Sequence, residues 1–232
     1  MPIPYKTALI VGAGDGLSAS IARTFHAAGL SIALAARNPD KLSDLCAEID
    51  AQPFSCDAAQ PDAVAALFQS VETHMGIPDV VVYNPSARTR GPLVALDPAD
   101  VEQAIAVTAY GGFLVAQQAV KRMLSLGQGA ILFTGASASV KGYPRSAVFA
   151  MGKFALRGLA QSMARELAPQ NIHVGHFIID GAIRNPGVTE SLNQPDSMLD
   201  PDAIAQNYLH MLQQHRSTWT WEIELRPWVE RF

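Results

Sequence analysis

Short apolar segments alternate with helical patterns along almost the whole chain, and this alternation restricts the fold more than any other feature. Five segments are short and apolar on both faces, as buried strands are: 8–11, 31–35, 80–82, 130–133 and the more mixed 173–179. Amphipathic or alanine-rich stretches predict helices over 17–29, 39–50, 61–75, 98–125, 146–168 and 202–214. Because strands that alternate with helices form right-handed βαβ units, the pattern predicts an α/β fold with a parallel sheet.

The length and composition fit one domain. The 232 residues are 49% hydrophobic and 16% charged, which is enough for one sizeable core. The sequence contains neither an internal repeat nor a low-complexity linker, so we expect a single domain over residues 1–232. One irregular stretch, at about 184–201, is polar and proline-containing, and it predicts a loop over the substrate side of a site.

The charge and the termini restrict the partners. A net charge of −4 and a pI near 5.8 argue against nucleic acid or an anionic membrane as a partner. The two cysteines, Cys46 and Cys56, are too few for a disulfide framework. The first residues lack the basic region and apolar run of a signal peptide, and no stretch has the length of a membrane span. We expect a cytoplasmic protein that binds a small molecule.

A glycine-rich turn follows the first apolar segment. Residues 11–18 are Val-Gly-Ala-Gly-Asp-Gly-Leu-Ser, and a helical pattern starts at once. Glycines here let the backbone turn tightly and approach a pyrophosphate at the helix N-terminus. A tight turn without a ligand is the alternative interpretation, but the position in the first βα turn favours dinucleotide binding. The candidate cofactor-binding residues are Gly12, Gly14, Asp15, Gly16 and Leu17.

The glycine turn resembles the T-G-x-x-x-G-x-G motif of the short-chain dehydrogenase/reductase family, with Val11 and Ser18 at its two ends. Residues 79–86, Asp-Val-Val-Val-Tyr-Asn-Pro-Ser, resemble the family's D-x-L-V-N-N-A-G strand, and the likeness covers essentially the whole chain. It implies a Rossmann-type doubly wound seven-stranded parallel sheet with helices on both faces. It also implies that the cofactor contacts extend to Asp57, Asn84, Gly181 and Ile183.

The second apolar segment ends in Ala35-Ala36-Arg37, which bears on the choice of dinucleotide. An acidic residue here would bind the ribose 2′-hydroxyl and repel a 2′-phosphate, whereas a guanidinium can bind that phosphate. The resemblance therefore implies NADP(H) as the cofactor, with NAD as the alternative. Asp15 in the glycine turn argues the other way, and a solvated loop arginine is the other interpretation of Arg37.

The family's catalytic groups are mostly substituted. Residues 149–153, Phe-Ala-Met-Gly-Lys, stand where the resemblance places Y-x-x-x-K, so Lys153 is kept and Phe149 replaces the proton-donating tyrosine. Ala136 stands at the serine position and Thr108 at the asparagine position. A missing general acid typically costs about 10²–10⁴-fold in rate. The resemblance implies that Lys153 binds the nicotinamide ribose.

Two residues are candidate replacements for the acid: Tyr143, in the loop before the helix predicted over 146–168, and Asp180, which follows the apolar segment 173–179. The leading hypothesis is an NAD(P)(H)-dependent oxidoreductase that acts on a carbonyl or alcohol with an atypical catalytic site. The alternative is a catalytically silent dinucleotide-binding protein, either a sensor or a subunit. A third possibility is reduction of a substrate that takes its proton from water.

The sequence also predicts an assembly and excludes an obvious metal site. Met151, Ala155, Gly158 and Ser162 form one stripe of mostly small residues, which either packs on the sheet or meets another subunit. The resemblance implies pairing of such helices, so we expect a homodimer or homotetramer. His173 and His176 lie three apart in a strand and point to opposite faces, so we expect no metal.

Overall fold

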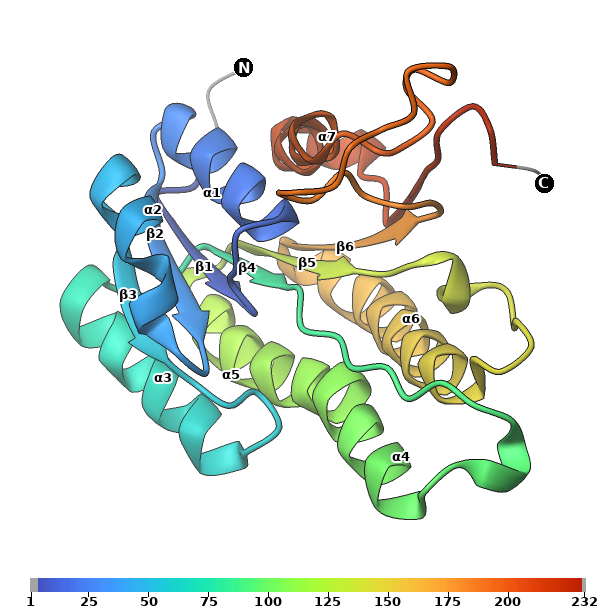
Figure 1. The fold of residues 1–232 in the computed structure, drawn as a ribbon. Helices are drawn as coiled ribbons and strands as arrows, with labels where there is room; N and C mark the ends of the chain where they lie inside the picture. Colours follow the sequence, from blue (N-terminus) through green and yellow to red (C-terminus); the bar gives the residue numbers. More distant parts are fainter. Residues whose placement is uncertain (1–3, 231–232) are drawn as a thin grey trace.

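The computed structural model describes residues 4–230 and contains one seven-stranded sheet in which every pairing is parallel (Figure 1). The strand order is β3-β2-β1-β4-β5-β6-β7. The strands are β1 (Thr7–Val11), β2 (Ser31–Ala36), β3 (Gln52–Ser55), β4 (Val80–Tyr83), β5 (Gly129–Thr134), β6 (Ile172–Ile179) and β7 (Glu222–Leu225). This arrangement confirms the predicted doubly wound Rossmann-type sheet, because the chain runs outward in both directions from β1.

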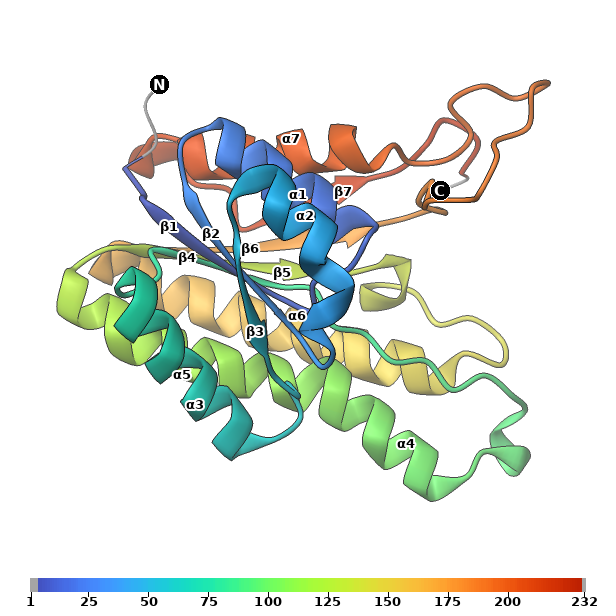
Figure 2. The same ribbon diagram turned by 60° about the vertical axis from the view of Figure 1, so that its left-hand side comes forward.

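Helices cover both faces of the sheet (Figures 1 and 2). They are α1 (Leu17–Ala27), α2 (Ser43–Ile49), α3 (Pro61–Met75), α4 (Pro98–Ile105), α5 (Gly111–Leu126), α6 (Ala147–Leu167) and α7 (Pro201–Gln213). Helices α1, α2 and α7 pack on one face, and α3, α5 and α6 pack on the other. Central strands β1, β4 and β5 are buried along their whole length, which explains why they are apolar on both faces.

The helix predicted over 98–125 is helical throughout, but its winding changes in the middle. A π-helical turn at Ala106–Tyr110 separates α4 from α5. Gly111 follows this turn, and a Cβ atom there would lie 2.5 Å from the Tyr83 hydroxyl oxygen. A Cβ on Gly112 would lie 2.5 Å from Cδ1 of Leu156. The start of α5 therefore lies close against β4 and α6, a tertiary requirement that helical periodicity does not reveal.

The stretch predicted as a loop over the site runs from Arg184 to the start of α7. Its two ends meet in a single bridge between Ile183 and Leu199, with the Leu199 amide donating to Ala182 at 2.8 Å. The side chain of Asp200 then caps α7 by accepting from the amides of Asp202 and Ala203. Within residues 4–230, every helix is too short or too polar to span a bilayer.

Candidate functional site

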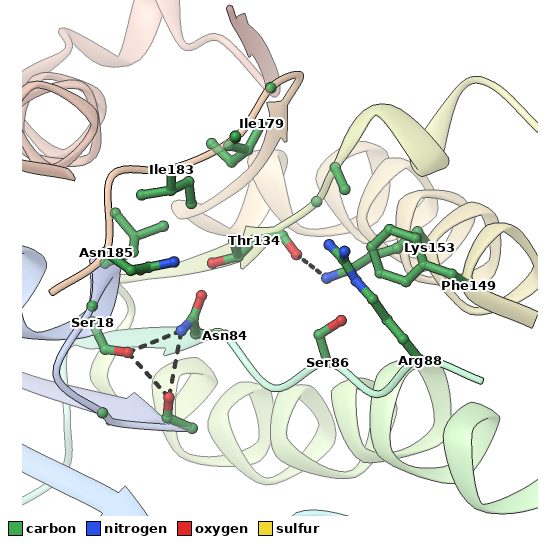
Figure 3. A pocket seen from close by; sticks show the side chains of 18 residues that line it. Ser18, Asn84, Ser86, Arg88, Thr134, Phe149, Lys153, Ile179, Ile183 and Asn185 are labelled. Carbon is green, nitrogen blue, oxygen red and sulfur yellow. Dashed lines mark hydrogen bonds between the residues drawn. The ribbon is translucent and has the colours of Figure 1, made fainter. Parts of the chain in front are cut away.

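Two adjoining cavities lie at the carboxyl edge of the sheet, where the chain leaves β1 and β4 in opposite directions. They have volumes of about 530 Å³ and 820 Å³. Gly12, Gly14 and Asn84 line both of them, so the glycine turn separates two halves of one site. In open parallel sheets, ligands bind at such a reversal of strand order. Figure 3 shows the smaller cavity.

The glycine turn has little room for side chains. Gly12 has a φ of +80°, and a Cβ there would lie 2.7 Å from the Pro85 ring. A Cβ on Gly16 would lie 2.6 Å from Oδ1 of Asn185, which the loop after β6 brings over the turn. Gly14, by contrast, has open space beside it and faces both cavities. Since Gly16 is the N-cap of α1 and has no side chain, the first helical amides remain available to an anion.

Ser18 and Asn84 hold the turn against the sheet (Figure 3). Asn84 Nδ2 donates to Ser18 Oγ at 2.9 Å, and Ser18 Oγ donates to the Gly12 carbonyl oxygen at 3.1 Å. The backbone N–H of Asn84 also donates to the Val11 carbonyl oxygen at 3.0 Å. The sequence predicts Asn84 as a cofactor contact, and the structure shows that its hydrogen bonds hold the turn in place.

Three further predicted cofactor residues line the larger cavity. Asp15, Arg37 and Asp57 line it, as does Lys41, which the sequence analysis did not single out. Arg37 is exposed at the end of β2, and the Asp57 carboxylate accepts from the Ala59 amide at 3.0 Å. Two cations beside one end of a cavity suit a phosphate group. The remaining glycine-turn residue, Leu17, lines the smaller cavity.

Lys153 is buried yet lines the smaller cavity (Figure 3). Its Nζ donates to the Thr134 carbonyl oxygen at 2.7 Å and lies 6.0 Å from the centroid of the Phe149 ring. Burial, together with the positive charge of Arg88, lowers the pKa of Lys153 to about 7. Phe149 and Ala136 line the same cavity, so neither of these walls offers a hydroxyl.

Arg88 is a cavity residue that the sequence analysis missed. It comes from the loop after β4, and its guanidinium carbon lies 4.0 Å from the centroid of the Phe149 ring. Arg88 is an exposed residue overall, but the partial burial of its guanidinium and the nearby charge of Arg90 lower its pKa. The sequence signal that could have revealed it is the pair of arginines at positions 88 and 90. They follow residues 79–86, and this segment leads away from the carboxyl end of a central strand.

The two candidate replacement acids lie elsewhere. Tyr143 is exposed on the loop before α6, and the described residues that line the two cavities do not include it. Asp180 is buried but does not line them either. Its carboxylate pairs with Lys141 at 2.9 Å and with Arg226 at 3.2 Å. The structure thus surrounds Asp180 with cations from two other segments.

Gly181 and Ile183, the other two predicted cofactor residues, line the smaller cavity. Gly181 has a φ of +153°, and a Cβ there would lie 2.7 Å from the Pro227 ring. The segment after β7 therefore crosses directly over this glycine. This segment packs against the outer side of the cavity wall, and only a glycine, which has no side chain, fits beneath it.

The two strand histidines contact different groups. His173 lies 2.9 Å from the Thr220 carbonyl oxygen, and His176 lies 3.0 Å from Glu222 and 3.4 Å from Ser139 Oγ. Burial lowers the pKa of His176 to about 4. Within residues 4–230, no group of three or more histidine, cysteine or acidic side chains is arranged to hold a metal ion.

A parallel sheet with a glycine turn at its point of reversal defines a protein of the dinucleotide-binding Rossmann class. The family model described as short chain dehydrogenase matches residues 6–196, and the chain belongs to this family of oxidoreductases. A short-chain dehydrogenase from Rhodopseudomonas palustris is 36% identical, with a TM-score of 0.83 over 96% of this chain and 99% of that one.

Two further relatives are informative. A metagenomic short-chain oxidoreductase, solved in complex with NADP, is 26% identical, with a TM-score of 0.84 over 97% of this chain and 98% of that one. The D-threitol dehydrogenase of Mycolicibacterium smegmatis is 28% identical over 174 residues, which cover 73% of this chain and 67% of that protein. The chain is thus similar to proteins named for the oxidation or reduction of small molecules.

Proposed function

We propose that this protein is an NADP(H)-dependent oxidoreductase that interconverts a small carbonyl compound and its alcohol. The glycine turn supports dinucleotide binding, because its open side at Gly14 and the free first turn of α1 fit a pyrophosphate. Arg37 and Lys41 support NADP over NAD, because both are cations at the end of the larger cavity. The NADP complex of the 26% identical relative supports the same choice.

Lys153 is the proton donor in this proposal. The observation that carries it is a buried lysine amine at the cavity wall, next to the position from which the family's tyrosine is missing. A pKa of about 7 means that the amine holds its proton near neutrality and can also release it. Tyr143 and Asp180 do not have this placement.

The dinucleotide, when bound, supplies the hydride that adds to a carbonyl carbon. The carbonyl oxygen then receives the electron pair of the broken π bond and needs a proton, which the Lys153 ammonium donates. The neutral amine regains a proton from water. Phe149 and Ala136 offer no hydroxyl, so neither competes with the Lys153 ammonium as the hydrogen-bond donor to the developing alkoxide.

The test is turnover of NADPH with a panel of aldehydes, ketones and quinones, followed at its absorbance band. We expect measurable wild-type reduction and a loss of at least about 100-fold in Lys153→Met. The variant should keep its melting temperature, because methionine removes a buried charge and preserves the length of the side chain. Lys121→Met, at an exposed position on α5, is the matched control.

Calorimetric titration with NADPH separates the alternatives. If the wild type binds NADPH but reduces no member of the panel, the protein is a silent dinucleotide-binding sensor or subunit and the proposed activity is wrong. If Lys153→Met retains wild-type turnover, the oxidoreductase remains but its proton comes from another group or from water. If NADPH does not bind, both the activity and the cofactor are wrong.

A further inference from the structure

The smaller cavity is electropositive. The charged side chains among the described residues that line it are Arg88 and Lys153, both cations, and no aspartate or glutamate accompanies them. Part of the low pKa of Lys153 comes from the charge of Arg88, so the two cations already repel each other across the cavity. Arg88, together with Lys153 in its protonated form, has no lining carboxylate to balance it, and this charge favours an anionic occupant.

The position of the Arg88 guanidinium is the second observation. It lies over the Phe149 ring with a carbon-to-centroid distance of 4.0 Å and lines the cavity, so the N–H donors on its rim that do not meet the ring are open to an occupant (Figure 3). Residues 4–230 provide no hydrogen-bond or ion-pair acceptor for this edge. A planar fork of N–H donors matches a carboxylate in bidentate geometry.

Arg88 lies on the side of the cavity opposite the glycine turn, so the phosphates of a bound dinucleotide are not the anion that Arg88 binds. The glycine turn lies on the Ser18 and Asn84 side of the cavity, whereas Arg88 and Phe149 form the opposite side (Figure 3). Arg37 and Lys41 line the other cavity. The anion that meets Arg88 therefore belongs to the second ligand, the substrate.

We propose that the substrate carries a carboxylate that Arg88 binds, within one or two carbon atoms of the reacting carbonyl. This inference rests on the proposed function and names its substrate class, which is a short oxo acid in one direction and the corresponding hydroxy acid in the other. The carboxylate lies next to the carbonyl because Phe149, on which Arg88 stacks, occupies the position of the family's proton-donating tyrosine. Arg88 is then a substrate-binding residue that selects by charge.

The first experiment compares matched pairs of substrates that differ only in charge. With NADPH, 2-oxobutanoate and 3-oxobutanoate are measured against their methyl esters. We expect kcat/KM to favour each acid, and Arg88→Gln to remove about 10- to 100-fold of that preference through KM for the acid. Arg90→Gln is the matched control, because Arg90 lies two residues away and outside the cavity lining, and it should keep the preference.

Equal or better turnover of the esters by the wild type would overturn the inference and leave the oxidoreductase intact. An equal loss for acids and esters in Arg88→Gln would also overturn it, since a packing defect affects both members of a pair.

A binding readout separates this inference from the proposed activity. Oxamate, an unreactive analogue of a 2-oxo acid, is titrated by calorimetry into the protein with and without NADPH, and neutral oxamide serves as its control. Oxamate binding that Arg88→Gln weakens at least about 10-fold supports the carboxylate site even if no substrate turns over. Turnover of neutral ketones without oxamate binding would sink the inference and preserve the proposed function.

Discussion

Phe149 affects both the proton chemistry and the electrostatics of the cavity. Its ring lies 4.0 Å from the guanidinium carbon of Arg88 and 6.0 Å from Nζ of Lys153. An aromatic face attracts cations, so this ring stabilises Arg88 where a tyrosine would place a hydroxyl. Phe149 thus contacts one cation of the cavity and lies near the other.

Restoring the missing hydroxyls tests whether this cavity still positions a substrate. We expect Phe149→Tyr with Ala136→Ser to raise turnover of neutral ketones by at least about 100-fold, because the new phenol has Lys153 beside it. Steady-state kinetics with NADPH measure the effect. A double variant that binds NADPH like the wild type and gains no activity would show that the cavity does not orient such substrates.

The pH dependence of reduction follows from the Lys153 amine. Its pKa is lowered from the ordinary 10.5 to about 7, so the ammonium form predominates below pH 7 and is lost above it. As the donor of a proton, Lys153 should give a kcat for reduction that falls as pH rises through about 7, and a kcat for alcohol oxidation that rises. A profile measured from about pH 5.5 to about pH 9 that stays flat would contradict this role.

Arg37 carries a prediction about the cofactor. NADPH should bind more tightly than NADH, and Arg37→Ala should remove most of the difference, about 1.5–3 kcal/mol, because a charged phosphate contact is lost. Calorimetry or fluorescence titration of both cofactors measures it, with Arg165→Ala on the exposed side of α6 as the control. Equal affinities in the wild type, or a preference for NADH, would refute the assignment.

At the scale of elements, two glycines of the turn between β1 and α1 have different roles. Gly12 allows the backbone conformation of the turn, and Gly14 leaves room in the cavity for a ligand. Gly12→Ala should destabilise the fold by about 1–3 kcal/mol, because its φ is positive and the Pro85 ring blocks a Cβ. Gly14→Ala should leave stability within about 0.5 kcal/mol but weaken NADPH binding, because the new methyl group enters the cavity. Urea unfolding and calorimetry measure the two effects, and equal losses of stability would contradict this division.

The elements were predictable where one local pattern determines them. Buried parallel strands leave continuous apolar segments, and the glycine turn leaves its spacing, so five strands and the β1–α1 turn follow from the sequence. The edge strands β3 and β7 are only partly buried and leave no continuous apolar segment. The π-helical turn at Ala106–Tyr110 does not, because it depends on how closely α5 approaches Tyr83 across sequence positions that are distant. The same holds for Arg88, since only the folded chain shows that its guanidinium meets Phe149.

At the scale of the whole molecule, the stripe on α6 bears on assembly. Met151, Ala155, Gly158 and Ser162 are all exposed, so the stripe does not pack on the sheet of its own chain. Phe154 on α6 and the stacked ring pair Tyr110 and Phe113 are also exposed. Exposed apolar side chains on neighbouring helices are typical of subunit contacts.

We therefore expect a homodimer or homotetramer that uses this surface. Gly158→Leu should weaken the assembly without unfolding the monomer, because no atom lies within 4 Å of a Cβ built there. Light scattering at micromolar concentration measures the mass, and Thr73→Leu on α3 is the control for an added exposed leucine. A monomer mass for the wild type would refute the assembly.

The cations of the two cavities have a consequence beyond contact distance. Lys153 and Arg88 line the smaller cavity without a carboxylate, whereas Arg37 and Lys41 share the larger one with Asp15 and Asp57, in a protein whose net charge is −4. The bulk of the surface therefore repels anions weakly while the smaller cavity attracts them, and low-dielectric walls focus such a field. An anionic ligand is steered to this cavity over roughly one Debye length, about 8–10 Å at physiological ionic strength. The association rate of anionic ligands thus depends partly on ionic strength, even where the geometry of the bound complex does not.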